Sequence, residues 1–278
     1  MQISPRYEGL PIISIDGATD DQLVPVSRQR RRLEDTLSQL SEVEWASPSR
    51  CVGWSVQDVV AHLASVNQFW TASIRAGLAG KPTRLLANFD PVAVPAFLVD
   101  QTRGLSSAQA LEQFVSSNAS LLGILESVGA EDWAVTAEAP PGHLPIRLVA
   151  SHALWDCWVH ERDIAVPLGV VIPTMSDEVC SGLRYAAALS AAFGILSGHA
   201  VAGTFALQTQ DPDMSIVLEI GDSAVVRDGV EVGTKSVLRG DAVELLEALS
   251  VRTPLAADVP DEWRKLLSGL ATVFEGGS

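Results

Sequence analysis

Apolar residues recur every three to four positions over much of the first 200 residues, which is the spacing of helices that bury one face. In residues 20–40 the repeat is Leu23, Val26, Arg30, Leu33, Leu37 and Leu40, and we expect the arginines of this helix to face water. The pattern returns over residues 55–78 and 107–128, and a further helix begins at Pro145, which suits a first helical turn. Four long helices joined by irregular connections predict a bundle, and a fifth helix at 175–196 leads out of it.

Short-range signals support some of these boundaries and predict loops elsewhere. Ser55, with Asp58 three residues later, resembles a capping box and predicts a helix start. The segments FDPVAVPAF (89–97) and PPGHLP (140–145) are interrupted by proline, so we expect them to be loops that shape a substrate pocket. His143, in the second segment, either lines the entrance of that pocket or is an exposed loop histidine.

The pattern of apolar and polar residues changes after Gly198. The segments GTFALQTQ, MSIVLEIGD, SAVVRDG and EVGTKSVLRG are short, partly alternating and bounded by Gly and Asp, which predicts antiparallel strands, and AVELLEAL and DEWRKLLSGLATVF return to a helical pattern. The predicted fold class is α plus α+β. Residues 1–17, which lack a sustained period, form a packing arm; residues 18–198 form a helical bundle; and residues 199–278 form a small antiparallel α+β domain.

Composition excludes several partners. The chain has 34 Asp and Glu against 19 Lys and Arg, a formal net charge of -15, so nucleic acid is not an expected partner. No basic segment followed by an apolar one opens the chain, and no stretch approaches the ~20 uninterrupted apolar residues of a membrane span. We therefore expect a cytoplasmic protein with no membrane partner. Cys51, Cys157 and Cys180 are widely separated and are expected to be reduced thiols.

Ionisable residues cluster within one apolar helix, in the segment HALWDCWVHERD (152–163). On a helical wheel His152, His160 and Asp163 fall within about 40° of Asp156, and apolar residues flank this stripe on both sides. Such groups must be paired, hydrated or bound to a metal, because an isolated buried charge costs several kcal/mol or more.

Two members of the stripe have the spacing of metal ligands. Asp156 and His160 lie four residues apart, on adjacent turns of one face and within chelating reach of one ion. His62, at the border of the apolar face of the second helix, is the best candidate for a third ligand. Three protein ligands of this type leave one coordination position open, which is typical of a catalytic zinc site.

Each of these residues also has a structural alternative. His62 can be a satisfied core histidine, and Asp156 with His160 can be a buried hydrogen-bonded pair. His152 competes as a ligand, but three successive turns of one helix cannot surround an ion, so we expect it to line the pocket or support the ligands.

Two further residues near the stripe have competing interpretations. Asp163 can accept the second N–H of His160 and orient that ring, or it can form a surface salt bridge with Arg162. Cys157 lies off the polar stripe, so a core thiol is preferred to a nucleophile.

The segments CVGWSVQDVVAHLASV (51–66) and DCWVHERDIAVPLG (156–169) resemble the mycothiol-dependent maleylpyruvate isomerase family, among the DinB-like metalloenzymes. The resemblance implies a four-helix bundle that binds a divalent metal, commonly zinc, through His62, Asp156 and His160. This chain has Asp156 where the isomerase is expected to have Glu. The segment LRGDAVELLEALSVRT is similar to the family's C-terminal domain and places Arg252 as an anion-binding group for a carboxylate substrate, although Val251 replaces the usual Gly.

The resemblance implies an enzyme that uses a low-molecular-weight thiol, mycothiol, as nucleophile toward a small electrophile. The outcome is cis–trans isomerisation if the thiol is released and S-transfer if it stays attached. Two alternatives of other classes remain open. One is a non-catalytic metal-binding protein, and the other is a lipid-binding or partner-binding protein acting through its C-terminal domain, which is similar to sterol-carrier folds. The sequence leaves the oligomeric state open.

Overall fold

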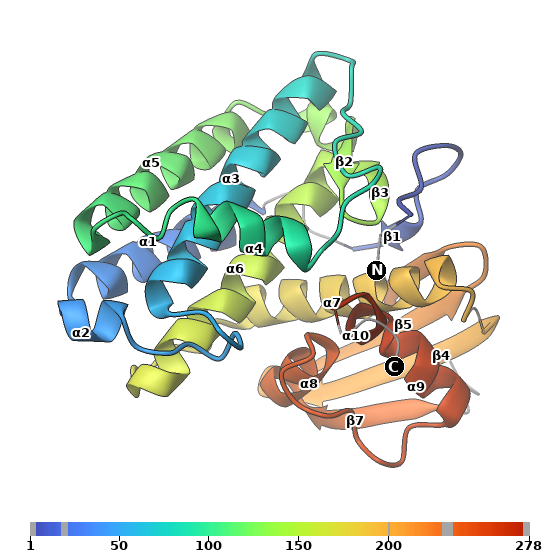
Figure 1. Cartoon of the computed structure of the whole chain (residues 1–278). Coiled ribbons are helices and arrows are strands. Elements are labelled where there is room, and N and C mark those ends of the chain that lie inside the picture. Colours follow the sequence, from blue (N-terminus) through green and yellow to red (C-terminus); the bar gives the residue numbers. More distant parts are fainter. Residues whose placement is uncertain (1–3, 18–21, 200, 230–235, 275–278) are drawn as a thin grey trace.

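The computed structural model describes residues 4–17, 22–199, 201–229 and 236–274. Four long helices form the predicted bundle: α1 (Leu23–Ser38), α3 (Val56–Leu78), α5 (Ser107–Glu126) and α6 (Ile146–Leu168). Helix α1 packs on α5, α5 on α3, α3 on α6 and α6 on α1, which closes a ring around a common core (Figure 1). The predicted fold class, a helical bundle followed by a small α+β unit, is confirmed.

The start and end of the two helices that carry the candidate ligands follow from local chemistry. At the start of α3 the hydroxyl of Ser55 accepts from the backbone N–H of Asp58 (3.2 Å), and the Asp58 carboxylate accepts from the backbone N–H of Ser55 (2.9 Å). This is the predicted capping box. Helix α6 ends at Gly169, whose φ of 68° is a left-handed conformation that costs glycine little.

The first helix departs from the prediction at one position. The expectation that its arginines face water is wrong for Arg30, whose exposed fraction is 1%. Arg30 lies on the same stripe as Leu33 and Leu37, which are both buried in the bundle. The apolar spacing of this helix therefore includes one charged residue in the core.

Part of the segment expected to be a loop at residues 89–97 is helical. Helix α4 (Ala93–Asp100) begins there, and the carboxylate of Asp90 accepts from the backbone N–H of Ala93 at 2.8 Å. Pro95 lies in the first turn, where a helix needs no backbone N–H. Pro95 is therefore compatible with a helix that begins at Ala93. A one-turn helix that the sequence pattern does not predict, α2 (Glu42–Trp45), precedes α3.

The second expected loop is a β-hairpin of β2 (Thr136–Ala139) and β3 (Gly142–Pro145). Its His143 lies against the ring of Tyr7, and its Nε2 is 2.8 Å from the carbonyl oxygen of Thr83. The hairpin leads into the first residue of α6, and about 20 Å of helix separates it from His160. His143 therefore does not line the entrance of a site at His160.

Within the described residues, the C-terminal sheet has five strands in the order β1-β6-β5-β4-β7. They are β1 (Ile13–Ile15), β4 (Gly203–Gln210), β5 (Met214–Ile220), β6 (Ala224–Asp228) and β7 (Val237–Asp241). Strands β4, β5 and β6 are antiparallel as predicted, but β1 pairs parallel with β6 and β7 pairs parallel with β4, so the sheet is mixed. The segment expected to be a packing arm thus supplies an edge strand of this sheet.

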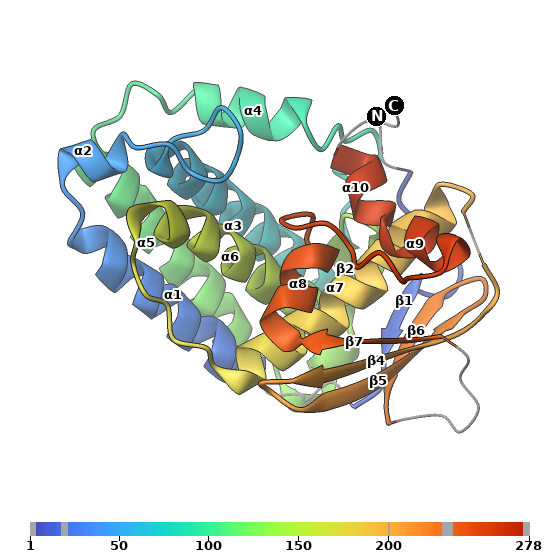
Figure 2. The ribbon, with the colours of Figure 1, turned by 90° about the horizontal axis from the view of Figure 1, so that it is seen from below.

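Helix α7 (Ser176–Leu196) is the element shared by the two parts of the molecule. It packs on α6 of the bundle and on β1, β5 and β6 of the sheet, and α8 (Ala242–Leu249), α9 (Asp261–Leu267) and α10 (Gly269–Phe274) also pack on it (Figure 2). It is the one described helix that is long and apolar enough to cross a membrane. However, 72% of its apolar window is buried inside the protein, which identifies it as a core helix.

Candidate metal centre

The packing of α3 on α6 brings together all three side chains that the sequence singles out as ligands. Potential ligand atoms of His62, Asp156 and His160 lie within 4.8 Å of one another. The Nε2 atom of His160 is 3.7 Å from Oδ1 of Asp156, and the imidazole rings of His62 and His160 meet edge to face with centroids 4.9 Å apart. His62 on α3 and the pair Asp156 and His160, one turn apart on α6, therefore converge at one position between the two helices.

The exposure of these groups fits a site that a ligand can reach. The Asp156 and His160 side chains are 14% and 12% exposed, and His62 is half-buried. The second carboxylate oxygen of Asp156, Oδ2, is buried and has no hydrogen-bond partner among the described residues. Burial raises the pKa of Asp156 and lowers that of His62, so both side chains lack the stabilisation of their charged forms that water would give. Two imidazoles and an under-satisfied carboxylate form a suitable donor set for a divalent cation of the zinc type.

The prediction that Asp163 contacts the ring of His160 is confirmed. Its Oδ2 lies 3.0 Å from Nδ1 of His160, so the Nε2 atom is left to face Asp156. Burial alone would lower the pKa of His160, but the hydrogen bonds to Asp163 and Cys51, together with the nearby charge of Asp156, raise it to about 10. The alternative, a salt bridge with Arg162, is wrong: Arg162 pairs with Glu247 at 2.7 Å, and the Asp163 side chain is fully buried.

Two arginines hold Asp163 in place. Arg252 donates from Nε (2.8 Å) and Nη2 (2.6 Å) to the two oxygens of Asp163, and Arg50 donates from Nε to Oδ1 (3.0 Å). Arg50 also donates two hydrogen bonds to Glu247 on α8. Although burial opposes it, the hydrogen bonds from His160 and Arg252 hold the pKa of Asp163 far below its ordinary value. Arg252 is therefore not a free surface arginine, and the C-terminal unit contributes directly to the surroundings of His160.

The turn that carries Arg252 has an unusual backbone. Val251 has a φ of 61°, a left-handed conformation that is costly for a β-branched residue, and the backbone N–H of Arg252 donates to the carbonyl of Glu247 at 2.9 Å. This is the end of α8, where glycine is the residue that adopts such a conformation most easily. Val251 thus adopts a backbone conformation that is usual for glycine.

The structure also places Cys51, which the sequence does not single out, beside the centre. Its Sγ lies 3.2 Å from Oδ2 of Asp163 and 3.7 Å from Nδ1 of His160. Cys51, His160 and Asp163 form a second group with the spacing of metal ligands, but the guanidinium groups of Arg50 and Arg252 already occupy Asp163. Their positive charge disfavours a cation there. Cys157 is a buried thiol of the core, which agrees with the prediction that it is not a nucleophile. Burial raises its pKa to about 12.

His152 lies in the core and does not line the site. Its ring is surrounded by Trp70, Trp155 and Tyr185, and its Nδ1 is 2.7 Å from the Tyr185 hydroxyl. Burial lowers its pKa to about 3. The expectation that it lines the pocket or supports the ligands is wrong, because its contacts are with these aromatic side chains.

His152 gives a pH dependence of stability. Between about pH 6.5 and 3 the unfolded chain binds a proton on this residue and the folded protein does not, so the free energy of unfolding falls as the pH is lowered. We expect the wild type to lose about 2 kcal/mol more than His152→Gln between pH 6.5 and 5. Urea unfolding at the two pH values measures this difference, and equal losses in the two proteins would contradict it.

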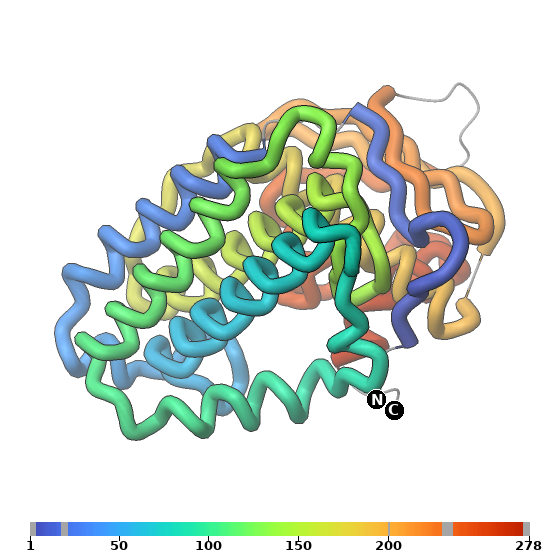
Figure 3. Tube along the Cα trace, turned by 90° about the horizontal axis from the view of Figure 1, so that it is seen from above, coloured from blue at the N-terminus to red at the C-terminus, as the bar shows by residue number. Residues whose placement is uncertain are grey.

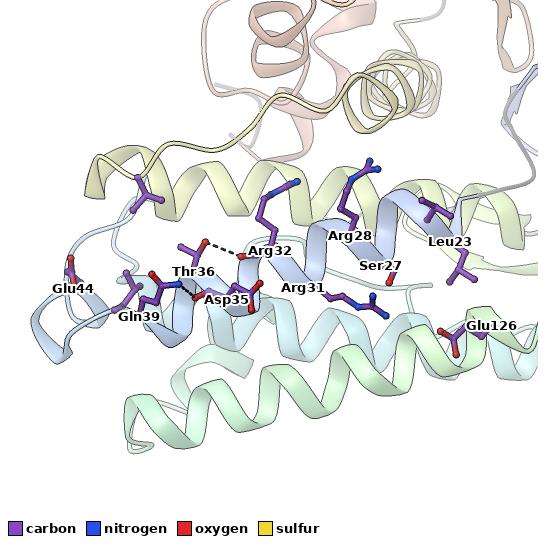
Figure 4. Close-up of a pocket in the computed structure, with 13 residues that line it drawn as sticks. Leu23, Ser27, Arg28, Arg31, Arg32, Asp35, Thr36, Gln39, Glu44 and Glu126 are labelled. Atoms are coloured by element: carbon purple, nitrogen blue, oxygen red, sulfur yellow. Dashed lines mark hydrogen bonds between the residues drawn. The ribbon is translucent and has the colours of Figure 1, made fainter.

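One surface groove lies apart from the candidate centre. It runs along the outer face of α1 and is lined by Leu23, Ser27, Arg28, Arg31, Arg32, Asp35, Thr36, Gln39 and other residues, including Glu126 of α5 (Figure 4). None of the three candidate ligands lines it. It is an open groove lined by both apolar and charged side chains, and it is separate from the position where His62, Asp156 and His160 meet.

Together these features define a class of protein. A helical bundle brings two imidazoles and a carboxylate close together, and a mixed-sheet unit that follows it places an arginine beside them. Residues 26–165 match the family model of the mycothiol maleylpyruvate isomerase N-terminal domain, which covers half of the chain. The protein belongs to this family.

Solved structures have the same fold. The crystal structure of the mycothiol-dependent maleylpyruvate isomerase is 16% identical, with a TM-score of 0.60 over 86% of this chain and 90% of that chain. A histidine-to-alanine mutant of a mycothiol-dependent maleylpyruvate isomerase is also 16% identical, with a TM-score of 0.61 over 87% of this chain and 95% of that chain. A comparison with curated proteins gives no significant match. At this level of identity the likeness establishes the fold, and the activity must be argued from the site.

Proposed function

We propose that this protein is a metal-dependent enzyme that uses mycothiol as a nucleophile toward a small electrophilic substrate. The observation that carries the proposal is the approach of His62, Asp156 and His160 to within 4.8 Å at a position that remains partly exposed. Membership of the mycothiol maleylpyruvate isomerase family supports the choice of thiol.

His62, Asp156 and His160 would hold the ion, for which zinc is the best fit to two imidazoles and one carboxylate. When bound, the ion lowers the pKa of a coordinated thiol, so that a thiolate is available near neutral pH. Three protein ligands leave a coordination position for that sulfur. Asp156 has a shorter side chain than the Glu expected in the isomerase, so its carboxylate reaches less far from α6.

The remaining side chains fix the geometry. Asp163 accepts from Nδ1 of His160, which leaves Nε2 directed at the ligand cluster, and Arg252 and Arg50 in turn hold Asp163. The family resemblance implies that Arg252 binds a substrate carboxylate. Its Nε and Nη2 are already engaged by Asp163, and one of the two N–H groups of Nη1 is donated to the carbonyl of Ser250. In this proposal Arg252 orients Asp163 and can offer its remaining Nη1 N–H to an anionic substrate.

The thiolate adds to an electrophilic carbon of the substrate. Rotation about the weakened bond followed by expulsion of the thiolate restores the double bond and gives cis–trans isomerisation. If the adjacent carbon instead takes up a proton, the new carbon–sulfur bond is kept and the product is a thioether, which is S-transfer. Both outcomes require the same arrangement of His62, Asp156 and His160. The proposal is therefore the general class, thiol-dependent chemistry on a small electrophile, and it does not choose between the two reactions.

The test is turnover by the zinc-loaded protein with mycothiol, using maleylpyruvate and a panel of uncharged electrophiles as substrates. We expect a product that depends on both zinc and thiol: an isomer with the thiol returned, or a thioether with the thiol consumed. A chelator-treated sample is the control. Bound zinc without any thiol-dependent product would instead favour a non-catalytic metal-binding protein.

A further inference from the structure

A buried arginine lies in the bundle next to the candidate centre. Arg30 of α1 is 1% exposed, and its Nη2 donates to the carbonyl oxygen of Ala153 on α6 (3.1 Å) and to Oδ1 of Asn67 on α3 (3.2 Å). Its Nε and Nη1 atoms are buried and have no hydrogen-bond partner among the described residues. A guanidinium remains charged in a protein, so this charge needs a counterpart.

Neighbouring arginines of the same helix form the salt bridges that are usual for a guanidinium. Arg28 pairs with Glu178 at 2.9 Å, and Arg32 pairs with Glu161 at 2.6 Å and with Glu178 at 2.8 Å. Within the part of the chain that the structure describes, Arg30 makes no such salt bridge with any carboxylate. Its direct partners are one amide oxygen and one backbone carbonyl.

The contacts of Arg30 place it at the level of Asp156. The carbonyl oxygen of Ala153 lies on α6 one turn before Asp156, and oxygens of an α-helix point toward its C-terminus. On the opposite side a buried polar layer continues from Asn67 to Asn118 (2.7 Å) and from Asn118 to Glu34 (2.6 Å). The guanidinium therefore lies in a polar layer of the core that crosses α1, α3, α5 and α6.

Asp156 presents its two oxygens to different surroundings. Oδ1 is the oxygen near Nε2 of His160 (3.7 Å), whereas Oδ2 is buried and has no hydrogen-bond partner among the described residues. An unpaired inward oxygen and an unpaired buried guanidinium thus occur at the same level of the core.

We propose that Arg30 is a positioning residue for Asp156: its guanidinium attracts the inward oxygen Oδ2 and so holds the carboxylate with Oδ1 facing the metal position. Arg30 does not contact substrate or metal and acts only through Asp156. The inference rests on the proposed function in that Asp156 is taken to be a ligand. The inference explains why a charged residue occupies a core position of α1.

The test is the zinc affinity of Arg30→Met and Arg30→Lys, measured by competition with a chromophoric chelator. We expect Arg30→Met to bind zinc about 10- to 100-fold more weakly, as losses of groups that support ligands often do, and Arg30→Lys to lose less because the charge is kept. The visible spectrum of the cobalt-substituted proteins should change in band position and intensity with Arg30→Met. Arg31→Met, at an exposed position of the same helix, is the matched control and should leave the affinity unchanged.

A double-mutant cycle separates positioning from a general loss of stability. If Arg30 acts through the charge of Asp156, Arg30→Met in an Asp156→Asn background should change zinc affinity by less than about threefold. Equal zinc affinity of wild type and Arg30→Met, or the full loss in the Asp156→Asn background as well, would overturn the proposal. If Arg30→Met does not fold, the same cycle with Arg30→Gln, which also removes the charge, gives the decision. Wild-type protein that binds no zinc would refute the proposed function itself.

Discussion

Replacing His160 by alanine is expected to leave the protein without bound metal. Wild-type protein loaded with zinc and dialysed should contain close to one ion per chain, and His160→Ala and His62→Ala should contain almost none. Each variant removes one of three ligands, and because even the loss of a group that only supports a ligand costs 10- to 100-fold in affinity, the loss of a ligand should cost at least about 100-fold. Elemental analysis and a chelator competition measure the two quantities.

The matched control for this result is His199→Ala, because His199 is exposed and is not part of the cluster. Its metal content should equal that of the wild type. Full retention of zinc by both His62→Ala and His160→Ala would show that the ion, if bound at all, is held elsewhere, and the proposed function would lose its supporting observation.

The substitution Asp163→Asn should have the next largest effect, on both stability and metal affinity. Asp163 is fully buried and accepts hydrogen bonds from Arg50 and Arg252. Removing its charge leaves two guanidinium groups facing a neutral amide, which should lower the free energy of unfolding by about 3 to 5 kcal/mol. The His160 ring also loses its charged acceptor, so zinc should bind roughly tenfold more weakly or worse.

A surface pair provides the comparison for Asp163→Asn. Asp177 is 51% exposed and pairs with Arg28, so Asp177→Asn should change the free energy of unfolding by less than about 1 kcal/mol and leave zinc affinity unchanged. Urea unfolding of the metal-free proteins gives the stabilities. An Asp163→Asn protein as stable as the wild type, with the same zinc affinity, would rule out the role assigned to Asp163.

The helical part of the fold could be predicted because its determinants are local. The starts of α3 and α5 follow from apolar spacing and from cap residues such as Ser55, which act within a few residues of the chain. The stripe that contains Asp156, His160 and Asp163 could be placed on one helix face for the same reason. The arrival of His62 at the same point depends on the packing of α3 on α6, which the resemblance implies and spacing alone does not determine.

The parts that could not be predicted depend on distant contacts. Strand β1 has three residues, too few for a period, and becomes a strand because Ile13 pairs with Ala224 more than 200 positions away (Figure 3). The contacts of Arg50 with Asp163 and Glu247 span 113 and 197 residues. No local pattern distinguishes Arg50 from an arginine in water. For Arg30 the signal is its position on the apolar stripe of its helix.

Helix α7 has a consequence for how the centre is assembled. Because this helix packs on α6 of the bundle and also on the sheet and α8, the orientation of His160 relative to Arg252 is set when the chain folds and does not await a hinge movement. During synthesis, a nascent chain that has already formed α3 and α6 still lacks the arginine that restrains Asp163. The surroundings of His160 are therefore completed only after Arg252, more than 80 residues beyond the end of α6, has been synthesised and has docked on the bundle.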